Sequence, residues 1–379
     1  MKMKVCLNFV SAVAFALILC ISHQAAAQRP VVNLNDVSLY AGGTLTFDSF
    51  TSVEGGATVA VGDVFGSLDV DSIFGQGSLS SNGFDDSRGE IFFNGGISGV
   101  GGPGSVLDGP VTSATGNIEI SGSTTVNGNV TAAGDVSQTF SFGTFNGNVL
   151  AGGNVEIDGT VNGNVTHGGA LTLGVFSDVT GSTSAGGAVS PAPFVAPTLP
   201  SGSGLVATGS DINLTTFEDI SLAPGNFGTL NFASANTVSL TSGTYIFEDI
   251  ISTFSLNELA FDTSAGPINI FVENSDVTLD LIQSINGVSL FAGVEPPLFE
   301  SNNITLEVGG SLTLGSDFFG TLLVPNGNLD LESDLTGRAL VGGDVILSGS
   351  VLTVPEPSSL LIGIGLLGLS AVRRNRRGI

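Results

Sequence analysis

The sequence predicts an all-β fold, a parallel β-helix (β-solenoid) in its right-handed form, and three observations favour it. Short stretches such as residues 45–47 and 58–61 alternate apolar and polar or small residues, and β-branched and aromatic residues recur as at residues 91–93, a pattern typical of strands. Asn-Gly-Asn and Gly-Gly corners separate such stretches and recur along the chain, which is typical of a solenoid. No run has helical spacing long enough to compete. A β-sandwich of regularly spaced hairpins stays open, because the repeat intervals are unequal.

Residues 1–27 have the three-part plan of a secretory signal peptide, which is helical until it is removed. Lys2 and Lys4 make its start positive, and an apolar stretch follows. The residues that define the expected cleavage site are Ala25, Ala27 and Gln28.

Both cysteines of the chain lie in this segment, at Cys6 and Cys20. A lipoprotein signal would use Cys20, but Leu19 before it is too bulky for the usual lipobox, so cleavage after Ala27 is favoured. The exported chain then has no thiol for a disulfide, a nucleophile or a metal site.

The body of the chain begins with an N-terminal β region at residues 28–115, and the clearest repeats follow at residues 116–184. Asn-Gly-Asn recurs at residues 127–129, 146–148 and 162–164, with offsets of 19 and 16 residues. One unit cannot bury its apolar side, whereas stacked units, about 4.8 Å apart, share a core and pair their backbones. We expect Gly and Asn at the corners because they tolerate a left-handed backbone.

Residues 185–204 form a Pro/Gly-rich loop or linker, and a second β-helical domain is expected at residues 205–353. Within this domain, turn and strand patterns occur at residues 224–228, 242–247, 266–272 and 320–327. Through these stretches, residues 220–350 resemble the β-helical surface domain of choice-of-anchor A and related adhesin-like proteins. The resemblance implies a secreted protein associated with a polymer or a matrix, with no established chemistry.

The C-terminal segment, residues 354–379, contains three features in a fixed order. A proline-rich break comes first, an apolar run at residues 360–372 follows, and an arginine cluster ends it. The break is Val354, Pro355, Glu356 and Pro357, and the cluster is Arg373, Arg374, Arg376 and Arg377. Proline keeps the break extended, the apolar run can enter lipid as a short helix, and the arginines hold the end on the cytoplasmic side. The apolar run is shorter than the roughly 20 residues of a comfortable span.

This order resembles the PEP-CTERM sorting tail of Gram-negative bacteria, whose family is also labelled "ice-binding protein C-terminal domain". The resemblance covers only the tail. It implies export, recognition of the tail by an exosortase, transient residence in the inner membrane, removal of the tail, and delivery to the cell surface or extracellular matrix. A single-pass C-terminal anchor stays open as the alternative.

The charge of the exported body limits its partners. Between Gln28 and Val354 there are 33 acidic residues, only three arginines and no lysine, a formal charge of −30. Such a surface repels nucleic acid and anionic lipid. We therefore expect no nucleic-acid partner, and an exopolysaccharide or another surface polymer as a candidate ligand.

Few residues could perform catalysis. His167, the one histidine after residue 27, lies at a repeat corner and is expected to be a solvated turn residue. Carboxylate pairs could hydrolyse or cleave a polysaccharide, which is the enzymatic alternative. The candidate groups are Asp69 with Asp71, Asp85 with Asp86, and Asp330 with Glu332 and Asp334, the last three on one strand face by alternation. We expect these to be solvated outer positions and assign no catalytic residue.

No cofactor or metal residue is assigned either. Oxygen ligands for Ca²⁺ are abundant, but neither the EF-hand spacing nor a Gly-Gly-x-Gly-x-Asp array occurs. Ice binding, the third hypothesis, needs ranks such as Thr-x-Thr on one flat face, and residues 44–46 are isolated. The sequence therefore predicts an exported, non-catalytic surface or matrix protein with a structural or adhesive role in an exopolysaccharide or biofilm.

Overall fold

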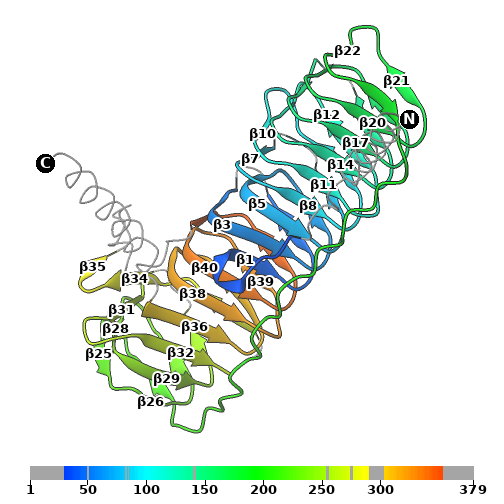
Figure 1. Cartoon of the computed structure of the whole chain (residues 1–379). Coiled ribbons are helices and arrows are strands. Elements are labelled where there is room, and N and C mark those ends of the chain that lie inside the picture. Colours follow the sequence, from blue (N-terminus) through cyan, green and yellow to red (C-terminus); the bar gives the residue numbers. More distant parts are fainter. Residues whose placement is uncertain are drawn as a thin grey trace, which may run out of the picture.

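The computed structural model describes residues 30–352, apart from 49–50, 82, 84, 140–141, 253–255, 274–275 and 290–302. The chain forms a parallel β-solenoid of about 15 turns, and Figure 1 shows it as a long rod. The described residues contain almost no helix, with η1 (Leu34–Asp36) a short 3-10 turn, and every described strand pairing is parallel except that of β34 with β35. The all-β solenoid prediction is confirmed, and the sandwich alternative is wrong. The expected signal helix and C-terminal apolar helix lie outside the described residues.

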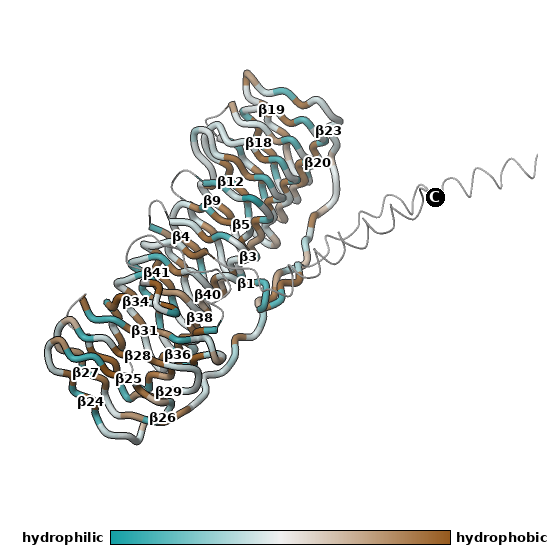
Figure 2. The backbone as a smooth tube through the Cα atoms, turned by 90° about the vertical axis from the view of Figure 1, so that its left-hand side faces the viewer, coloured by the Kyte–Doolittle hydropathy of each residue, from teal (hydrophilic) through white to brown (hydrophobic). Residues whose placement is uncertain are grey.

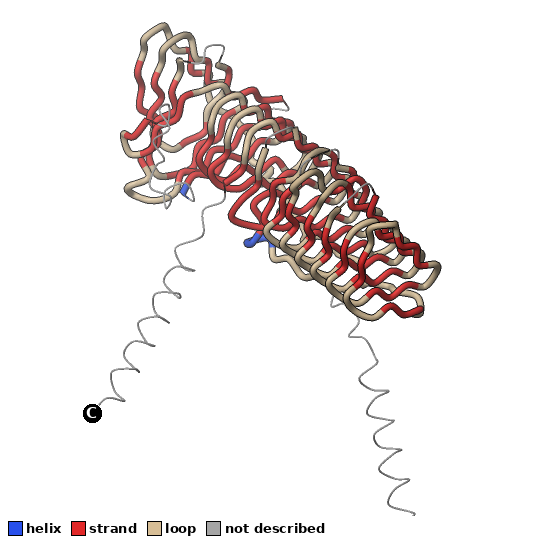
Figure 3. Tube along the Cα trace, turned by 90° about the horizontal axis from the view of Figure 1, so that it is seen from above, coloured by secondary structure: helices blue, strands red, loops and turns tan. Residues whose placement is uncertain are grey.

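Each turn of the rod contributes one strand to each of three faces, and Figure 3 shows the successive strands stacked along the length of the rod. From the lower to the upper end in Figure 1, face I contains β26 (Gly225–Asn226), β29 (Gly243–Phe247), β32 (Ile268–Val272), β36 (Ile304–Val308), β1 (Val37–Ala41), β8 (Ile91–Phe93), β11 (Val111–Ser113), β14 (Val130–Ala132), β17 (Val149–Ala151), β20 (Val165–His167) and β23 (Thr183–Ala185).

In the same order, face II contains β24 (Ile212–Asn213), β27 (Leu230–Asn231), β30 (Ile250–Ile251), β33 (Asp276–Leu279), β37 (Ser311–Leu314), β39 (Leu329–Leu331), β41 (Val345–Leu347), β2 (Leu45–Phe47), β4 (Val64–Phe65), β6 (Leu79–Ser80), β9 (Ile97–Val100), β12 (Ile118–Ser121), β15 (Val136–Thr139), β18 (Val155–Ile157) and β21 (Leu171–Leu173).

Face III contains β25 (Asp219–Leu222), β28 (Thr237–Thr241), β31 (Glu258–Asp262), β34 (Ile282–Ile285), β42 (Val351–Leu352), β7 (Asp86–Ser87), β10 (Val106–Leu107), β13 (Thr125–Val126), β16 (Thr144–Phe145), β19 (Thr160–Val161) and β22 (Asp178–Val179). Four strands bend round the corner from face III to face I: β38 (Phe318–Val324), β40 (Leu335–Val341), β3 (Val53–Ala60) and β5 (Asp69–Gly75). The remaining strand, β35 (Val288–Ser289), forms a hairpin with β34.

The order of the turns along the rod differs from their order in the sequence. The chain starts in the middle of the rod at β1 and climbs to the upper end at β23. It then returns along the outside to the lower end, and from β24 it climbs back to the middle (Figure 1). The rod is therefore a circularly permuted solenoid, with the N-terminal turns stacked on the C-terminal ones.

The junction between these halves, which we call the seam, pairs strands about 300 residues apart. β1 pairs with β40, β2 with β41, and β3 with β42, all parallel and in register. Thr46 of β2, for example, lies opposite Ile346 of β41. The seam therefore has the same geometry as the covalently continuous turns beside it.

The interior of the rod is one continuous apolar column, visible as the brown inner positions of the strands in Figure 2. Inward residues on successive turns stack on each other; Val126, Phe145 and Val161 of face III are all 0% exposed. This is the alternation that the sequence showed: one residue of each strand enters the core and its neighbour faces solvent.

The glycines of the three Asn-Gly-Asn corners are explained by lack of space and not by a left-handed backbone. A Cβ on Gly147 would lie 2.3 Å from the carbonyl oxygen of Gly128, and one on Gly163 would lie 2.4 Å from that of Gly147. None of these three glycines has a positive φ. The expectation that these corners require left-handed residues was wrong; successive turns stack too closely there for a side chain.

The segment that returns along the outside, residues 186–211, contains no strand, and we call it the strap. It covers an apolar outer patch of face I that includes Tyr40, Phe74 and Phe92. Phe194 of the strap is 1% exposed, and its ring centroid is 5.5 Å from that of Phe74. The patch spans the seam, because Leu340 of β40 belongs to it as well. The strap therefore belongs to an apolar cluster that contains residues from both halves of the rod.

Candidate functional surfaces

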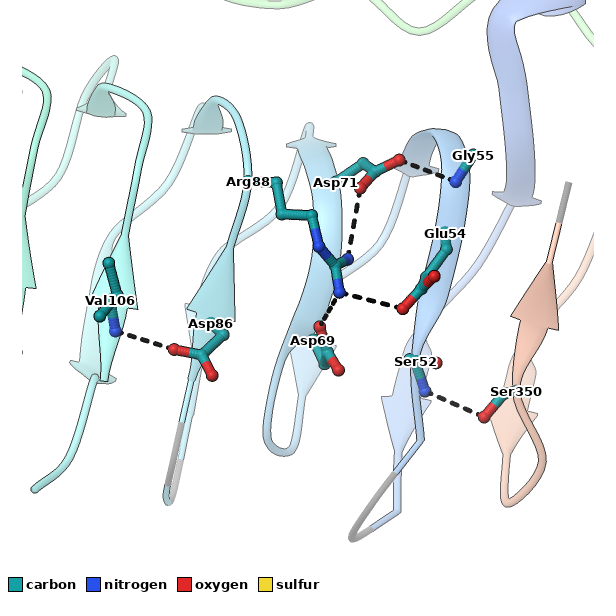
Figure 4. A network of polar contacts seen from close by, with 9 residues as sticks. All are labelled: Ser52, Glu54, Gly55, Asp69, Asp71, Asp86, Arg88, Val106 and Ser350. Atoms are coloured by element: carbon teal, nitrogen blue, oxygen red, sulfur yellow. Dashed lines mark hydrogen bonds and ion pairs between the residues drawn. The ribbon is translucent and has the colours of Figure 1, made fainter. Parts of the chain in front are cut away.

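The densest group of charged side chains lies where face III turns into face I, on adjacent turns (Figure 4). Arg88 forms ion pairs with Glu54 at 2.9 Å, with Asp69 at 3.3 Å and with Asp71 at 3.3 Å. Asp71 also accepts a hydrogen bond from the backbone N–H of Gly55 at 2.7 Å. We call Glu54, Asp69, Asp71 and Arg88 the arginine cluster.

The electrostatics of this cluster are those of a solvated surface. Partial burial raises the pKa of Asp69; Arg88 opposes this shift, and Glu54, Asp86 and Asp71 add to it. The Arg88 side chain is half exposed, and exposed pairs of this kind contribute about 0–1 kcal/mol each. The proposed pair Asp69 and Asp71 is thus bridged by a cation and carries no free acid–base couple.

The second proposed pair, Asp85 and Asp86, is split between inside and outside. Asp86 is exposed, and its carboxylate accepts a hydrogen bond from the N–H of Val106 at 2.8 Å (Figure 4). Asp85 is fully buried and accepts from the N–H of Leu68 at 2.7 Å, the N–H of Gly101 at 2.6 Å and the hydroxyl of Ser81. Burial raises the pKa of Asp85, while these three donors pull it down. Asp85 therefore joins neighbouring turns and does not face a substrate.

The third proposed group does not share a strand face. Strand β39 ends at Leu331, so Asp330 faces outward on face II, Glu332 follows the strand, and Asp334 lies at the next corner. Asp334 accepts a hydrogen bond from the N–H of Ser350 at 2.8 Å. The expected alternation over residues 330–334 was wrong, because the chain turns the corner after only three strand residues.

His167 is the last residue of β20 and pairs with Ala151 below it and Ala185 above it. Its Nδ1 lies 2.7 Å from the carbonyl oxygen of Gly169. The ring is half-buried, and no acidic or hydroxyl side chain is recorded as its hydrogen-bond partner within the described residues. A serine–histidine pair is therefore not formed by the described part of the chain.

Sequence reasoning missed a regular polar surface on face III. Three neighbouring turns present an outward Thr followed two residues later by an outward Asn: Thr125 and Asn127, Thr144 and Asn146, Thr160 and Asn162. The asparagine amides hydrogen-bond from turn to turn at 2.7 Å. The signal was a threonine two residues before each Asn-Gly-Asn motif. We call these positions the Thr/Asn ranks.

An open groove of about 550 Å³ runs along the edge of face II next to face I. Its acidic residues are Glu119, Asp135 and Glu156. The Oδ1 atom of Asp135 accepts a hydrogen bond from the N–H of Asn154 at 2.6 Å, so Asp135 joins two adjacent turns at this corner. Within the described residues no three His, Cys, Asp or Glu side chains are placed to hold a metal ion.

Both ends of the described chain lie at the middle of the rod. Leu352 of β42 pairs with Glu54 of β3, and the described N-terminal residues pack beside the seam through Val32 and Leu34. The residues assigned to signal cleavage (Ala25, Ala27, Gln28), to the sorting break (residues 354–357) and to the arginine end (residues 373–377) lie outside the described residues. The sorting break therefore begins two residues after a strand of the seam.

Comparison with family models identifies the tail. Residues 353–377 match the PEP-CTERM protein-sorting motif. The chain carries a PEP-CTERM sorting motif. This motif implies export that depends on an exosortase, and association with the surface of a Gram-negative cell. No helix within residues 30–352, as described, is long and apolar enough to cross a membrane.

No curated protein matches the chain. Two solved structures are similar over most of their length. One is a possible adhesin C-terminal domain from Caldicellulosiruptor kronotskyensis, at 9% identity and a TM-score of 0.29, with 87% of this chain and 96% of that one covered. The other is an ice-binding protein from an Antarctic Flavobacteriaceae bacterium, at 11% identity and a TM-score of 0.24, with 85% and 97% covered. With TM-scores this low, neither likeness bears on function, and the fold rests on the strand pairings above.

Proposed function

We propose that this protein is a non-catalytic rod, displayed on the cell surface or in the extracellular matrix after an exosortase removes its tail. The observation that carries the proposal is the position of the sorting motif, two residues beyond β42 in the middle of the rod. A rod whose C-terminal tail leaves from its middle would lie with its long side toward the cell. Its upper and lower ends would then both point away from the attachment point. In this proposal the inner membrane holds the protein only until the tail is removed.

The proposed role of the rod is structural or adhesive. Its outer surface is acidic and hydrogen-bonding. Among the candidate carboxylates, Asp69 and Asp71 are bridged by Arg88, Asp85 is buried, and Asp334 accepts a hydrogen bond at a corner. A long face of this kind suits multivalent, individually weak contacts with a neutral or cation-bridged exopolysaccharide, because many weak sites on one rod act together.

The experiment is mass spectrometry of the protein from whole cells, compared with a strain that lacks the processing enzyme. We expect a protein that begins at Gln28 and ends close to Pro355, and retention of residues 360–377 in the mutant strain. Recovery of an intact tail from the surface of normal cells would contradict the proposal.

Ice binding is the second candidate, because the Thr/Asn ranks give face III a regular polar array over three turns. The array is short: Asp108 lies below it and Asp178 above it. Thermal hysteresis measured for the wild type and for the Thr144→Leu variant tests this candidate. Thermal hysteresis in the wild type that is lost in the variant would support ice binding. A wild-type protein without thermal hysteresis would rule out this candidate.

The enzymatic alternative predicts new reducing ends or unsaturated products when the protein is incubated with acidic polysaccharides. We expect none, because Asp69 and Asp71 are bridged by Arg88, Asp85 is buried, and the acidic residues at 330, 332 and 334 do not share one strand face.

A further inference from the structure

Both ends of the rod are free for contact. At the upper end, β21, β22 and β23 each pair with one strand only, on the side toward the middle of the rod. At the lower end the same holds for β24 and β25. Since the described chain enters and leaves at the seam, neither terminus of residues 30–352 lies at an end of the rod. No described residue stacks beyond these five edge strands, whereas on face I of the lower end the last residues of the strap lie against β26.

Inward apolar residues of the two terminal turns are more exposed than the residues next to them in the adjacent inner turns. Leu173 at the upper end is 46% exposed, whereas Ile157 directly below it is 0% exposed. At the lower end Ile220 is half-buried, whereas Val238 above it is 0% exposed. The apolar column of the rod therefore opens to solvent at both ends. Solenoids ordinarily cover such ends with polar capping repeats.

We propose that the rods associate head to tail, with the lower end of one copy stacking on the upper end of a second copy. The seam shows that such a junction is possible in this protein. There β40 and β41 stack on β1 and β2 with no peptide link between them, in parallel register. In both halves of the rod the successive turns of the chain advance from the lower end toward the upper end. The two ends are therefore different surfaces, and the lower end of one copy can continue the upper end of another.

The strands of the two ends match on two of the three faces. On face II, β24 of the incoming copy continues the column above β21, which brings Leu214 over Leu173. On face III, β25 continues the column above β22, which brings Ile220 over Val179. Each of these residues belongs to the interior column of its own rod or to its exposed end. Stacking would bury Leu173, Val179 and Ile220 as their neighbours are buried one turn further in, and it would pack them against Leu214, which is already 8% exposed.

Face I requires an adjustment. The N–H of Gly228 donates to the carbonyl oxygen of Ser210, so the end of the strap occupies the lowest level of face I. In the stacked pair, the end of the strap of one copy and β23 of the other copy would occupy the same position on face I. All three residues of β23 are exposed, so β23 is the strand that moves aside.

Charge sets the conditions for this contact. Stacking would place Asp178 of β22 beside Asp219 of β25, both exposed, and each rod is strongly acidic. Raising the ionic strength from about 0.1 M to about 1 M shortens the Debye length from about 10 Å to about 3 Å. Association should therefore strengthen with salt. A heterologous contact of this type does not close, so the product is a series of longer rods.

The test uses sedimentation velocity and electron microscopy of the exported protein. Leu173→Asp places a charge at the upper end and Ile220→Asp at the lower end. The control is Ile346→Asp. The side chain of Ile346 is 44% exposed, a fraction similar to the 46% of Leu173, but it lies on the outer surface at the seam and not at an end of the rod. Circular dichroism checks folding, and Val179→Asp replaces Leu173→Asp if the latter misfolds.

We expect multiples of the single-rod length for the wild type and the control in about 1 M salt, and single rods for each end variant. An equimolar mixture of the two end variants should form dimers and nothing longer, because one intact end of each kind remains. Dimers of Ile220→Asp alone would mean contact between two upper ends and would overturn the proposal. Single rods for the wild type at every salt and protein concentration would overturn it as well.

Discussion

Asp344 accepts a hydrogen bond from the backbone N–H of Thr44, with Oδ1 and N 2.7 Å apart and 300 residues between them. Asp344 itself donates its N–H to Oδ1 of Asn328 at 2.9 Å. The same contact recurs at Asn117, Asp135 and Asn154 on the upper half of the rod. These side-chain-to-backbone hydrogen bonds form a corner ladder, and its step from Asp344 to Thr44 joins the two halves of the rod across the seam.

Replacing Asp344 tests the ladder at the seam. Asp344→Ala leaves the N–H of Thr44 without its side-chain acceptor, so we expect a loss of about 0.5–1.5 kcal/mol in the free energy of unfolding. Asp344→Asn keeps an acceptor oxygen, as in Asn328 and Asn154, and should stay within about 0.5 kcal/mol of wild type. Denaturant unfolding measures both. Equal losses for the two variants would show that the hydrogen bond is not the stabilising feature.

Thr58 is a weak point of the core beside the seam. It is 0% exposed, and its hydroxyl has no hydrogen-bond partner among the residues that the structure describes. Thr58→Val replaces that hydroxyl by a methyl group of similar size, so we expect a gain of about 1 kcal/mol or more in unfolding free energy.

Thr124 is the matched control. It is also 0% exposed, but its hydroxyl donates to the carbonyl oxygen of Ser121. Thr124→Val should therefore lower the unfolding free energy by about 1 kcal/mol. A loss of stability in both variants would contradict the assignment of Thr58 as unpaired.

Phe194 is expected to be the main anchor of the strap. Besides the contact with Phe74, its backbone N–H and carbonyl both hydrogen-bond to the Asn94 side chain, at 2.6 and 2.8 Å. Removing a buried Phe ring costs about 3 kcal/mol or more, which corresponds to an increase of about 100-fold in detached strap. Limited proteolysis of Phe194→Ala should then cut within residues 186–211 far faster than in wild type. Phe176→Ala is the control, because Phe176 is 76% exposed, and it should leave the cutting rate unchanged.

Mild acid should stabilise the rod. Burial raises the pKa of Asp85, Asp69 and Glu90 above the ordinary values of 3.8, 3.8 and 4.5. The folded chain therefore binds these protons more tightly than the unfolded chain, so their contribution is complete below the ordinary values and is lost as pH rises through the raised ones. The exposed Glu218 and Asp262 are shifted downward and act in the opposite sense.

We expect a higher unfolding free energy near pH 5 than near pH 7.5, and Glu90→Gln should reduce the difference. Relief of repulsion among the acidic residues acts in the same direction. Denaturant midpoints over this range provide the measurement, and a steady decline in stability from pH 7.5 to pH 5 would contradict the sign.

The solenoid could be predicted from the sequence because its signals are local. Val126 and Phe145 alternate with polar neighbours, and each Asn-Gly-Asn motif marks a corner. The order of the turns could not be predicted. Nothing near Thr44 indicates that its partner is Asp344, because the seam repeats the same corner pattern as every other turn.

The candidate surfaces were predicted less well, for a similar reason. The carboxylates at Asp69 and Asp71 were found, but the role of Arg88 depends on which turns are adjacent. Asp85 is followed by the polar residues 86–88, so no apolar–polar alternation marks it as an inward position. Its burial therefore could not be inferred from the sequence. The sorting motif was predicted fully because it is linear and needs no tertiary contact.

The permuted rod, with its tail in the middle, is tested most directly by a distance across the seam. Residues 28–379 contain no cysteine, so spin labels on Thr46→Cys and Ile346→Cys would be the two labels of the exported chain. These residues face each other on adjacent strands, about 4.8 Å apart. We predict strong dipolar broadening for this pair and none for Thr46→Cys with Thr172→Cys, whose strand β21 lies at the upper end. Weak coupling between positions 46 and 346 would contradict the account, because the two halves would then not meet.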